Sequence, residues 1–181
     1  MSTPYEIYCW VAGDSKKIYY IGVATDAERR YQEHLNGTGA KFAKKYKPNV
    51  LLCMSRYTGQ PLFKPKHITY FSEEEAKDLE NMVTRQFARY YGKNNVRGGS
   101  YCAVEDDTHI TDQHLHEHEE KDSTRCLFCD YMELRMIGSR AHDTPTCHHW
   151  HNLINGKVPP LFEQNVLRIK HQTSPLNGNR F

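Results

Sequence analysis

The sequence predicts an α/β protein of the α+β type, in which a small antiparallel sheet is flanked by helices and followed by a small zinc-binding module. Three observations support this fold class. Two short segments rich in aromatic and β-branched residues lie near the start of the chain and are separated by a Gly-Asp turn. A long segment with helical periodicity begins at Ser72. A Cys-x2-Cys pair, Cys126 and Cys129, precedes further cysteines and histidines, as in zinc sites.

Length and composition place the chain among ordinary folded proteins. Its 181 residues can form one domain with a small appendage, and a hydrophobic content of 38% is enough for a core. No apolar run approaches the roughly 20 residues of a membrane helix, and the first residues lack the pattern of a signal peptide. We therefore expect an intracellular protein without a membrane partner. Its six cysteines are then thiols or metal ligands rather than disulfides.

Charge is distributed unevenly along the chain. The net charge of +2 is too small to indicate nucleic acid by itself. Lysines and arginines crowd residues 29–56, however, while residues 105–122 are strongly acidic. A local basic face is typical of proteins that bind a polyanion, although a run of lysines is also typical of a solvated surface. The residues that we predict to contact nucleic acid are Lys41, Lys44, Lys45 and Arg97.

The chain is expected to begin with a β-hairpin. Residues 5–11 and 18–22 have the composition of strands, and the turn between them contains Gly13 and Asp14. The two strands should therefore be antiparallel neighbours, which brings Tyr8 near Tyr20.

A helix is expected to follow directly, over residues 26–36. Thr25 and Glu28 have the spacing of a capping box at its start. Within it Arg30 and His34 are four residues apart and share one face. A fixed guanidinium and a titratable imidazole should then point together at the end of the second strand, which indicates phosphate chemistry.

The next elements complete the sheet and supply a long helix. We expect a short basic helix over residues 40–46, a third strand over residues 50–57 and an edge strand or extension over residues 66–71. From Ser72 onward, an acidic first turn and a stripe of apolar residues predict a helix to about Tyr90. Glu80 lies at the edge of that stripe. A carboxylate there must reach water or hold a positive group, because burial of a bare charge is costly.

Residues 5–101 resemble the GIY-YIG nuclease family. The first half of the family signature appears as Glu6-Ile7-Tyr8, with its glycine replaced, and the second half is intact as Tyr20-Ile21-Gly22. The remaining landmarks of the family fall, in order, on Arg30, His34, Glu80 and a late asparagine at Asn95 or Asn94.

The resemblance implies hydrolysis of phosphodiester bonds with one divalent metal ion. Glu80 would hold Mg²⁺ or Mn²⁺, and Arg30 would bind the scissile phosphate. Tyr8 would act as the base with His34 as its proton acceptor, while Tyr20 orients water and phosphate. The roles of the two tyrosines could be reversed.

The second half of the chain is expected to hold a structural zinc ion. Cys126 and Cys129 form a typical zinc knuckle. A helix starting near Thr144 and Pro145 would place Cys147 and His151 one turn apart, so the preferred ligands are Cys126, Cys129, Cys147 and His151. His142 is the alternative to His151, with a spacing that resembles a classical zinc finger but leaves Pro145 inside the required helix.

We therefore expect a nuclease domain at residues 1–104, an acidic, histidine-rich linker or solvated helix at 105–122, a zinc-binding module at 123–160 and a tail at 161–181. The predicted function is that of a metal-dependent DNA endonuclease, similar to phage or mobile-element nucleases that cut or nick chosen sites. The alternatives are a nuclease selective for branched DNA and a non-catalytic nucleic-acid-binding adaptor. The protein could be a monomer or a transient dimer.

Overall fold

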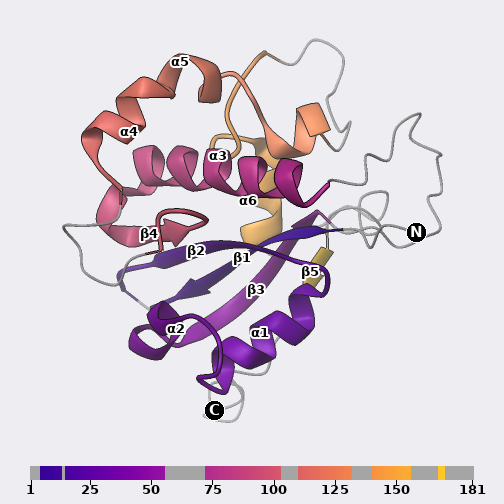
Figure 1. Ribbon diagram of the computed structural model, residues 1–181. Helices are drawn as coiled ribbons and strands as arrows, with labels where there is room; N and C mark the ends of the chain where they lie inside the picture. Colours follow the sequence, from indigo (N-terminus) through magenta and orange to yellow (C-terminus); the bar gives the residue numbers. More distant parts are fainter. Residues whose placement is uncertain are drawn as a thin grey trace, which may run out of the picture.

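The computed structural model describes residues 5–13, 15–55, 72–102, 110–131, 140–155 and 167–169. The helices and strands are β1 Glu6–Ala12, β2 Ile18–Ala24, α1 Ala27–Leu35, α2 Lys41–Lys45, β3 Pro48–Ser55, α3 Glu73–Tyr91, η1 Lys93–Asn95, β4 Val96–Gly98, α4 Asp112–Glu117, α5 Glu119–Asp122, η2 Leu127–Tyr131, α6 His148–Ile154 and β5 Leu167–Ile169. In Figure 1 the sheet lies between α1 and α2 on one face and the long helix α3 on the other, with α4 and α5 outside α3. This arrangement confirms the predicted α+β fold. The strand predicted for residues 66–71 lies outside the described residues.

Among the residues that the structure describes, the sheet has five strands in the order β4-β2-β1-β3-β5. β1 pairs antiparallel with both β2 and β3, and β5 pairs antiparallel with β3. β4 pairs with β2 in the parallel direction, so the sheet is mixed rather than purely antiparallel. The chain reaches β4 only after α3, and a crossover of this length permits parallel pairing. The part of the predicted tail that the structure describes, β5, thus supplies an edge strand.

The helices begin where side chains can accept their first N–H groups. α3 starts with a capping box in which Ser72 and Glu75 exchange hydrogen bonds. α1 is capped by Asp26, which accepts a hydrogen bond from the N–H of Arg29, and not by Thr25 as the sequence predicted. Glu6 adds a further cap, because its carboxylate accepts the N–H of Ala27 at 2.8 Å. The residue that replaces the signature glycine therefore fixes α1 against β1.

Each face of the sheet has its own hydrophobic core. The core under α1 and α2 is aromatic and includes Tyr8, Trp10, Tyr20 and Phe42. The core on the other face joins β1 and β2 to α3 and to the second half of the chain, and its members from that half are Ile110, Cys126, Leu127, Phe128, Cys129, Cys147, Trp150 and Leu153. The residues expected to form a zinc-binding appendage therefore share one core with α3.

Ion pairs hold α5, which lies in the segment predicted as a linker or solvated helix, against α3. The carboxylate of Asp122, at the end of α5, is 1% exposed and accepts hydrogen bonds from Arg85 at 2.8 Å and Arg89 at 3.1 Å. The solvated helix expected in this region thus corresponds to α4 and α5, which pack on α3. No helix among the described residues is long and apolar enough to cross a membrane.

Candidate active site and metal centre

The two signature tyrosines lie on the face of the sheet that α1 and α2 cover. In the β1–β2 pair, Tyr8 stands opposite Gly22 and Trp10 stands opposite Tyr20. The Tyr20 ring stacks on Trp10 with centroids 4.9 Å apart. Tyr8 instead extends across Gly22, where an added Cβ would lie 2.4 Å from the Tyr8 hydroxyl. The glycine of the Tyr-Ile-Gly signature is therefore required because the Tyr8 ring occupies the place of its side chain.

Helix α1 supplies a cation and an imidazole to this tyrosine. His34 is 1% exposed, and its Nε2 lies 3.2 Å from the Tyr8 hydroxyl. Its Nδ1 accepts the backbone N–H of Ala40 at 3.2 Å. The guanidinium of Arg30 lies close enough to hydrogen-bond Tyr8, and its Nη1 also pairs with Glu33 at 2.6 Å. The expected shared face of Arg30 and His34 is therefore directed at Tyr8.

Glu80 enters the site from α3. Its side chain is largely buried, at 9% exposure, and it accepts backbone N–H groups of Gly99 and Val23. Gly99 has φ +50°, and a Cβ there would lie 2.1 Å from the Asn81 side-chain oxygen, so the turn after β4 packs closely on α3. This turn is fixed by the N–H of Ser100, which donates to Asn81 Oδ1 at 2.9 Å.

The electrostatics indicate that these groups form one site. Burial raises the pKa of the Glu80 carboxyl to about 7. Burial also raises the pKa of Tyr8 well above its usual value, and Tyr20 and Glu80 add to this rise while Arg30 opposes it. Burial and the nearby Arg30 lower the pKa of His34 to about 4. Perturbed groups that act on each other in one place are typical of a functional site.

Two residues predicted for this site or its surroundings bond to backbone carbonyls of their own region. Asn95 donates through Nδ2 to the carbonyl of Tyr91 at 2.7 Å and so caps the end of α3. Arg97 is fully buried, donates to the carbonyl of Val96 and lies with its Cζ 5.1 Å from the centroid of the Phe42 ring. The prediction that Arg97 contacts nucleic acid is therefore wrong, because parallel pairing of β4 with β2 places it inside the aromatic core.

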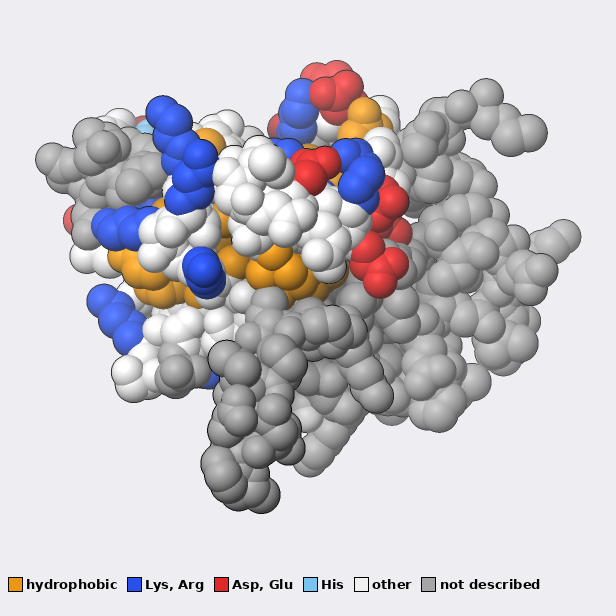
Figure 2. All heavy atoms as spheres, turned by 90° about the horizontal axis from the view of Figure 1, so that it is seen from below, with side chains coloured by type: hydrophobic (Ala, Val, Ile, Leu, Met, Phe, Trp, Pro, Cys, Tyr) orange, Lys and Arg blue, Asp and Glu red, His pale blue; other side chains and the backbone are white. Residues whose placement is uncertain are grey.

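The predicted basic surface lies on α2. Lys41, Lys44 and Lys45 are exposed, while Phe42 and Ala43 between them face the core. Figure 2 views the molecule from the side of α1 and α2, where lysine and arginine side chains spread over much of the described surface and acidic side chains gather at one end. This face is thus suited to a negatively charged partner.

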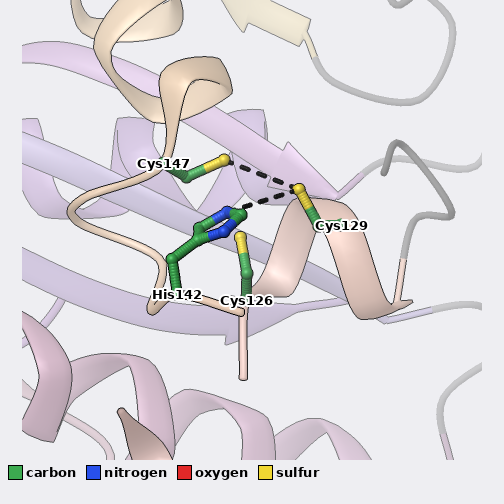
Figure 3. A group of neighbouring side chains, drawn as sticks. All are labelled: Cys126, Cys129, His142 and Cys147. Carbon is green, nitrogen blue, oxygen red and sulfur yellow. Dashed lines mark hydrogen bonds between the residues drawn. The ribbon is translucent and has the colours of Figure 1, made fainter. Parts of the chain in front are cut away.

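A second cluster of polar atoms has the geometry of a zinc site (Figure 3). One ligand atom from each of Cys126, Cys129, His142 and Cys147 lies within 4.8 Å of all the others. Cys129 Sγ is 3.8 Å from Cys147 Sγ and 3.5 Å from His142 Nε2. Sulfurs at 2.3 Å from a tetrahedral ion are separated by roughly 3.8 Å. The side chains are therefore arranged as zinc would require.

A hydrogen bond at Nδ1 of His142 determines that Nε2 is the nitrogen able to bind a metal. His142 Nδ1 lies 2.6 Å from the carbonyl oxygen of Arg140. A carbonyl can only accept, so Nδ1 carries the proton and Nε2 presents its lone pair to the position between the ligand atoms, where an ion would lie.

The structure gathers His142, the alternative ligand, and not the preferred His151. The predicted helix start at Thr144 and Pro145 is wrong, because these residues form a turn and α6 begins after Cys147. Because Cys147 precedes the helix, the four-residue spacing does not place its side chain on the same helix face as His151. His151 lies beside the Tyr90 ring instead. Pro145 is no obstacle to His142, which precedes the turn.

Residues that are far apart in the sequence support the cluster. Gln86 of α3 donates to the carbonyls of Asp122 and Arg125 and accepts the N–H of Thr144. The Thr144 hydroxyl accepts the N–H of Leu127. These contacts join positions up to 58 residues apart, so no local pattern indicates them. The only sequence signal was that Gln86 is a polar residue between apolar positions of a helix.

Comparisons with known proteins agree with this geometry. A family model described as the GIY-YIG catalytic domain matches residues 4–95. A UPF0213 protein of Cupriavidus necator is 39% identical over 75 residues, which are 41% of this chain and 72% of that protein. The UPF0213 protein YhbQ of Escherichia coli is 42% identical over 57 residues, 32% of this chain and 54% of its own length.

A UPF0213 protein of Xanthomonas axonopodis pv. citri is 35% identical over 54 residues, 30% of this chain and 51% of that protein. The chain thus spans about half the length of the last two relatives. No solved structure matches it. The match to the catalytic domain covers half of the chain and includes both tyrosines, Arg30, His34 and Glu80. This chain therefore belongs to the GIY-YIG family, whose catalytic domain is a nuclease fold.

Proposed function

We propose that this protein is a divalent-metal-dependent DNA endonuclease. The observation that carries the proposal is the buried hydroxyl of Tyr8, which contacts His34 and Arg30 and lies within electrostatic reach of Glu80. Together a phenol, a guanidinium and a buried carboxylate can supply the base, the phosphate-binding group and the metal ligand for phosphodiester hydrolysis.

Glu80 fits the role of ligand to Mg²⁺ or Mn²⁺. Its carboxylate is an oxygen donor of the kind that hard cations prefer, and two backbone N–H groups fix it at the end of β2. An ion there would act as a Lewis acid on the phosphate and neutralise charge on the leaving oxygen.

The protein groups then have separate tasks. Arg30 holds the scissile phosphate and balances the charge that develops on it. Tyr8 must first be ionised against its raised pKa, which the charge of Arg30 favours. As tyrosinate it then takes a proton from the attacking water while a new P–O bond forms and the bond to the leaving oxygen breaks. Tyr20 orients water or phosphate. The reversed assignment of the tyrosines would be revealed if Tyr20→Phe lost more activity than Tyr8→Phe.

We propose that Lys41, Lys44 and Lys45 bind the DNA backbone and that the enzyme nicks or cuts chosen sites, as phage and mobile-element nucleases do. The cluster of four zinc ligands, suited to one ion, supports this choice over nucleases selective for branched DNA. A panel of plain, branched and genomic DNA distinguishes the two, and gel filtration with and without DNA distinguishes a monomer from a transient dimer.

The first test is a nicking assay on supercoiled DNA with Mg²⁺ or Mn²⁺. We expect Glu80→Gln and Arg30→Ala each to lower the cleavage rate at least ~100-fold, as expected for loss of a group that stabilises transition-state charge. Glu74→Gln, on the exposed side of the same helix, and Arg29→Ala, the exposed neighbour of Arg30, are matched controls that should keep the rate. If the wild-type protein leaves every DNA of the panel intact with both metals, the adaptor alternative is favoured.

We also propose that Cys126, Cys129, His142 and Cys147 bind a structural zinc ion. The burial of all three cysteines in the core with α3 supports a bracing role over direct docking on DNA. Metal analysis of the purified protein should find about one zinc per chain. Cys126→Ser and His142→Ala should lower this content and the melting temperature, whereas His151→Ala should change neither. A folded protein without zinc, or zinc loss in His151→Ala alone, would refute the assignment.

A further inference from the structure

We propose that the backbone N–H of Ala40 fixes the tautomer of His34, so that the imidazole donates a hydrogen bond to the Tyr8 hydroxyl and cannot accept its proton. The tautomer follows from the geometry alone, whereas its role in cleavage rests on the proposed function. It replaces the expectation that His34 is the proton acceptor for Tyr8, and makes His34 a positioning residue.

The hydrogen bonds of the two ring nitrogens determine which of them carries the proton. The N–H of Ala40 lies 3.2 Å from Nδ1, and a backbone N–H can only donate. Nδ1 must therefore present a lone pair. A neutral imidazole with a bare Nδ1 carries its proton on Nε2, and Nε2 is the atom 3.2 Å from the Tyr8 oxygen. The Tyr8 oxygen is consequently the acceptor in this contact.

A tight turn after α1 brings the donor into place. The N–H groups of Thr38 and Gly39 both bond to the carbonyl of Glu33, which folds the chain back over the last turn of the helix. An added Cβ at Gly39 would lie 2.5 Å from His34 Nδ1, so only glycine lets the turn approach the ring this closely. Ala40 is then the N-cap of α2, which is anchored in the core through Phe42.

The surroundings keep His34 neutral, as the tautomer argument requires. Tyr8 and Tyr20 face the ring from β1 and β2, and Arg30 and Glu33 lie near it on α1. Burial and the charge of Arg30 lower its pKa to about 4, while Glu33 opposes this more weakly. At neutral pH the ring therefore carries one proton.

The hydrogen bond from His34 also determines the direction in which the O–H of Tyr8 points. A phenol oxygen has two lone pairs and one O–H. His34 donates to one lone pair, and Arg30, which also can only donate, is the neighbour that lowers the pKa of this hydroxyl. The Tyr8 O–H must then point away from both groups. After that proton is lost to solvent, the same direction offers a lone pair to the attacking water, while His34 and Arg30 stabilise the tyrosinate.

The direct test is nitrogen NMR of the full chain labelled at histidine. We expect His34 at pH 7 to show an unprotonated Nδ1 and a protonated Nε2, with its signals identified by their disappearance in His34→Gln. The opposite tautomer, or a ring protonated on both nitrogens, would overturn the proposal. This measurement needs no cleavage, so its failure is distinct from failure of the nuclease assignment.

The turn can be tested with two glycine variants. Gly39→Ala should displace the ring and shift the His34 nitrogen signals toward a mixture of tautomers. Gly37→Asn is the matched control, because Gly37 has φ +76° and nothing within 4 Å of an added Cβ, and asparagine tolerates that backbone conformation. Unchanged His34 signals in a folded Gly39→Ala protein would contradict the proposal that this turn fixes the tautomer of His34.

Cleavage kinetics then show whether His34 donates a hydrogen bond to Tyr8 or accepts its proton. His34→Ala removes a donor that stabilises charge on the Tyr8 oxygen and should lower the rate roughly 100-fold. His34→Gln keeps an N–H donor that can reach Tyr8, so it should recover most of this loss. Its pH–rate profile should match that of the wild type in shape. If His34→Gln is folded but as inactive as His34→Ala, the ring is a proton acceptor and the proposal is wrong.

Discussion

His34 connects the candidate site to the acid stability of the fold. Its pKa is about 4 in the folded protein and close to 6.5 in an unfolded chain. The unfolded state therefore binds a proton first as the pH falls. The stability contributed by neutral His34 is complete above pH ~6.5 and is lost between pH ~6.5 and ~4, by up to about 3 kcal/mol.

Urea unfolding of wild type and His34→Gln from pH 8 to pH 4.5 measures this contribution. The comparison between the two proteins is needed because Glu80 has a raised pKa and acts in the opposite direction over the same range. We expect the difference in free energy of unfolding to shrink as the pH falls. A difference that is constant with pH would show that His34 is not held neutral.

At the scale of residues, the sequence predicted the side chains that converge and missed the atoms that hold them. Helical spacing indicates the face shared by Arg30 and His34, whereas the resemblance to the nuclease family assigns Tyr8 and Glu80 to the site. Ala40 could not be predicted, because its contribution is a backbone N–H. The position of Arg97 could not be predicted either, because an arginine in a polar segment gives no sign that a parallel strand will bury it.

Helix α3 is the element on which both halves of the chain depend. It presents Glu80 to the sheet, Gln86 to the turn at Thr144, and Arg85 and Arg89 to Asp122. The sequence predicted this helix well, since its capping residues and apolar stripe are local features. Its long-range polar partners could not be predicted, and without them the sequence predicts a helix start at Thr144.

The buried carboxylate of α5 that pairs with α3 yields a stability prediction. Asp122→Ala leaves Arg85 and Arg89 without their buried partner and should lower the free energy of unfolding by about 3–5 kcal/mol. Asp112→Ala is the control, because its ion pair with Lys93 is exposed and should change stability by less than about 1 kcal/mol. Urea denaturation measures both. Equal effects would mean that the Asp122 network does not hold α5 to α3.

For the whole molecule, the placement of charge predicts how DNA is bound. Replacing Lys41, Lys44 and Lys45 by glutamine should weaken DNA binding and reduce the slope of log affinity against log salt by up to about 2.7, since each phosphate contact contributes about 0.9. The control replaces Lys77, Lys93 and Lys121, which lie on α3, η1 and α5, and removes the same charge. Fluorescence anisotropy at several salt concentrations measures the slope. If both triple variants lose affinity equally, net charge rather than the α2 face governs binding.

The shared core of α3 and the cysteine cluster affects the choice of reagents for this protein. Chelators such as EDTA are the usual way to show that a nuclease needs Mg²⁺. Here a chelator would also remove an ion bound by Cys126, Cys129 and Cys147, which pack in the same core as the helix that carries Glu80. Lost cleavage could then report a loosened fold rather than a missing catalytic ion. Removing Mg²⁺ by gel filtration, and restoring it alone, keeps the two metal requirements apart.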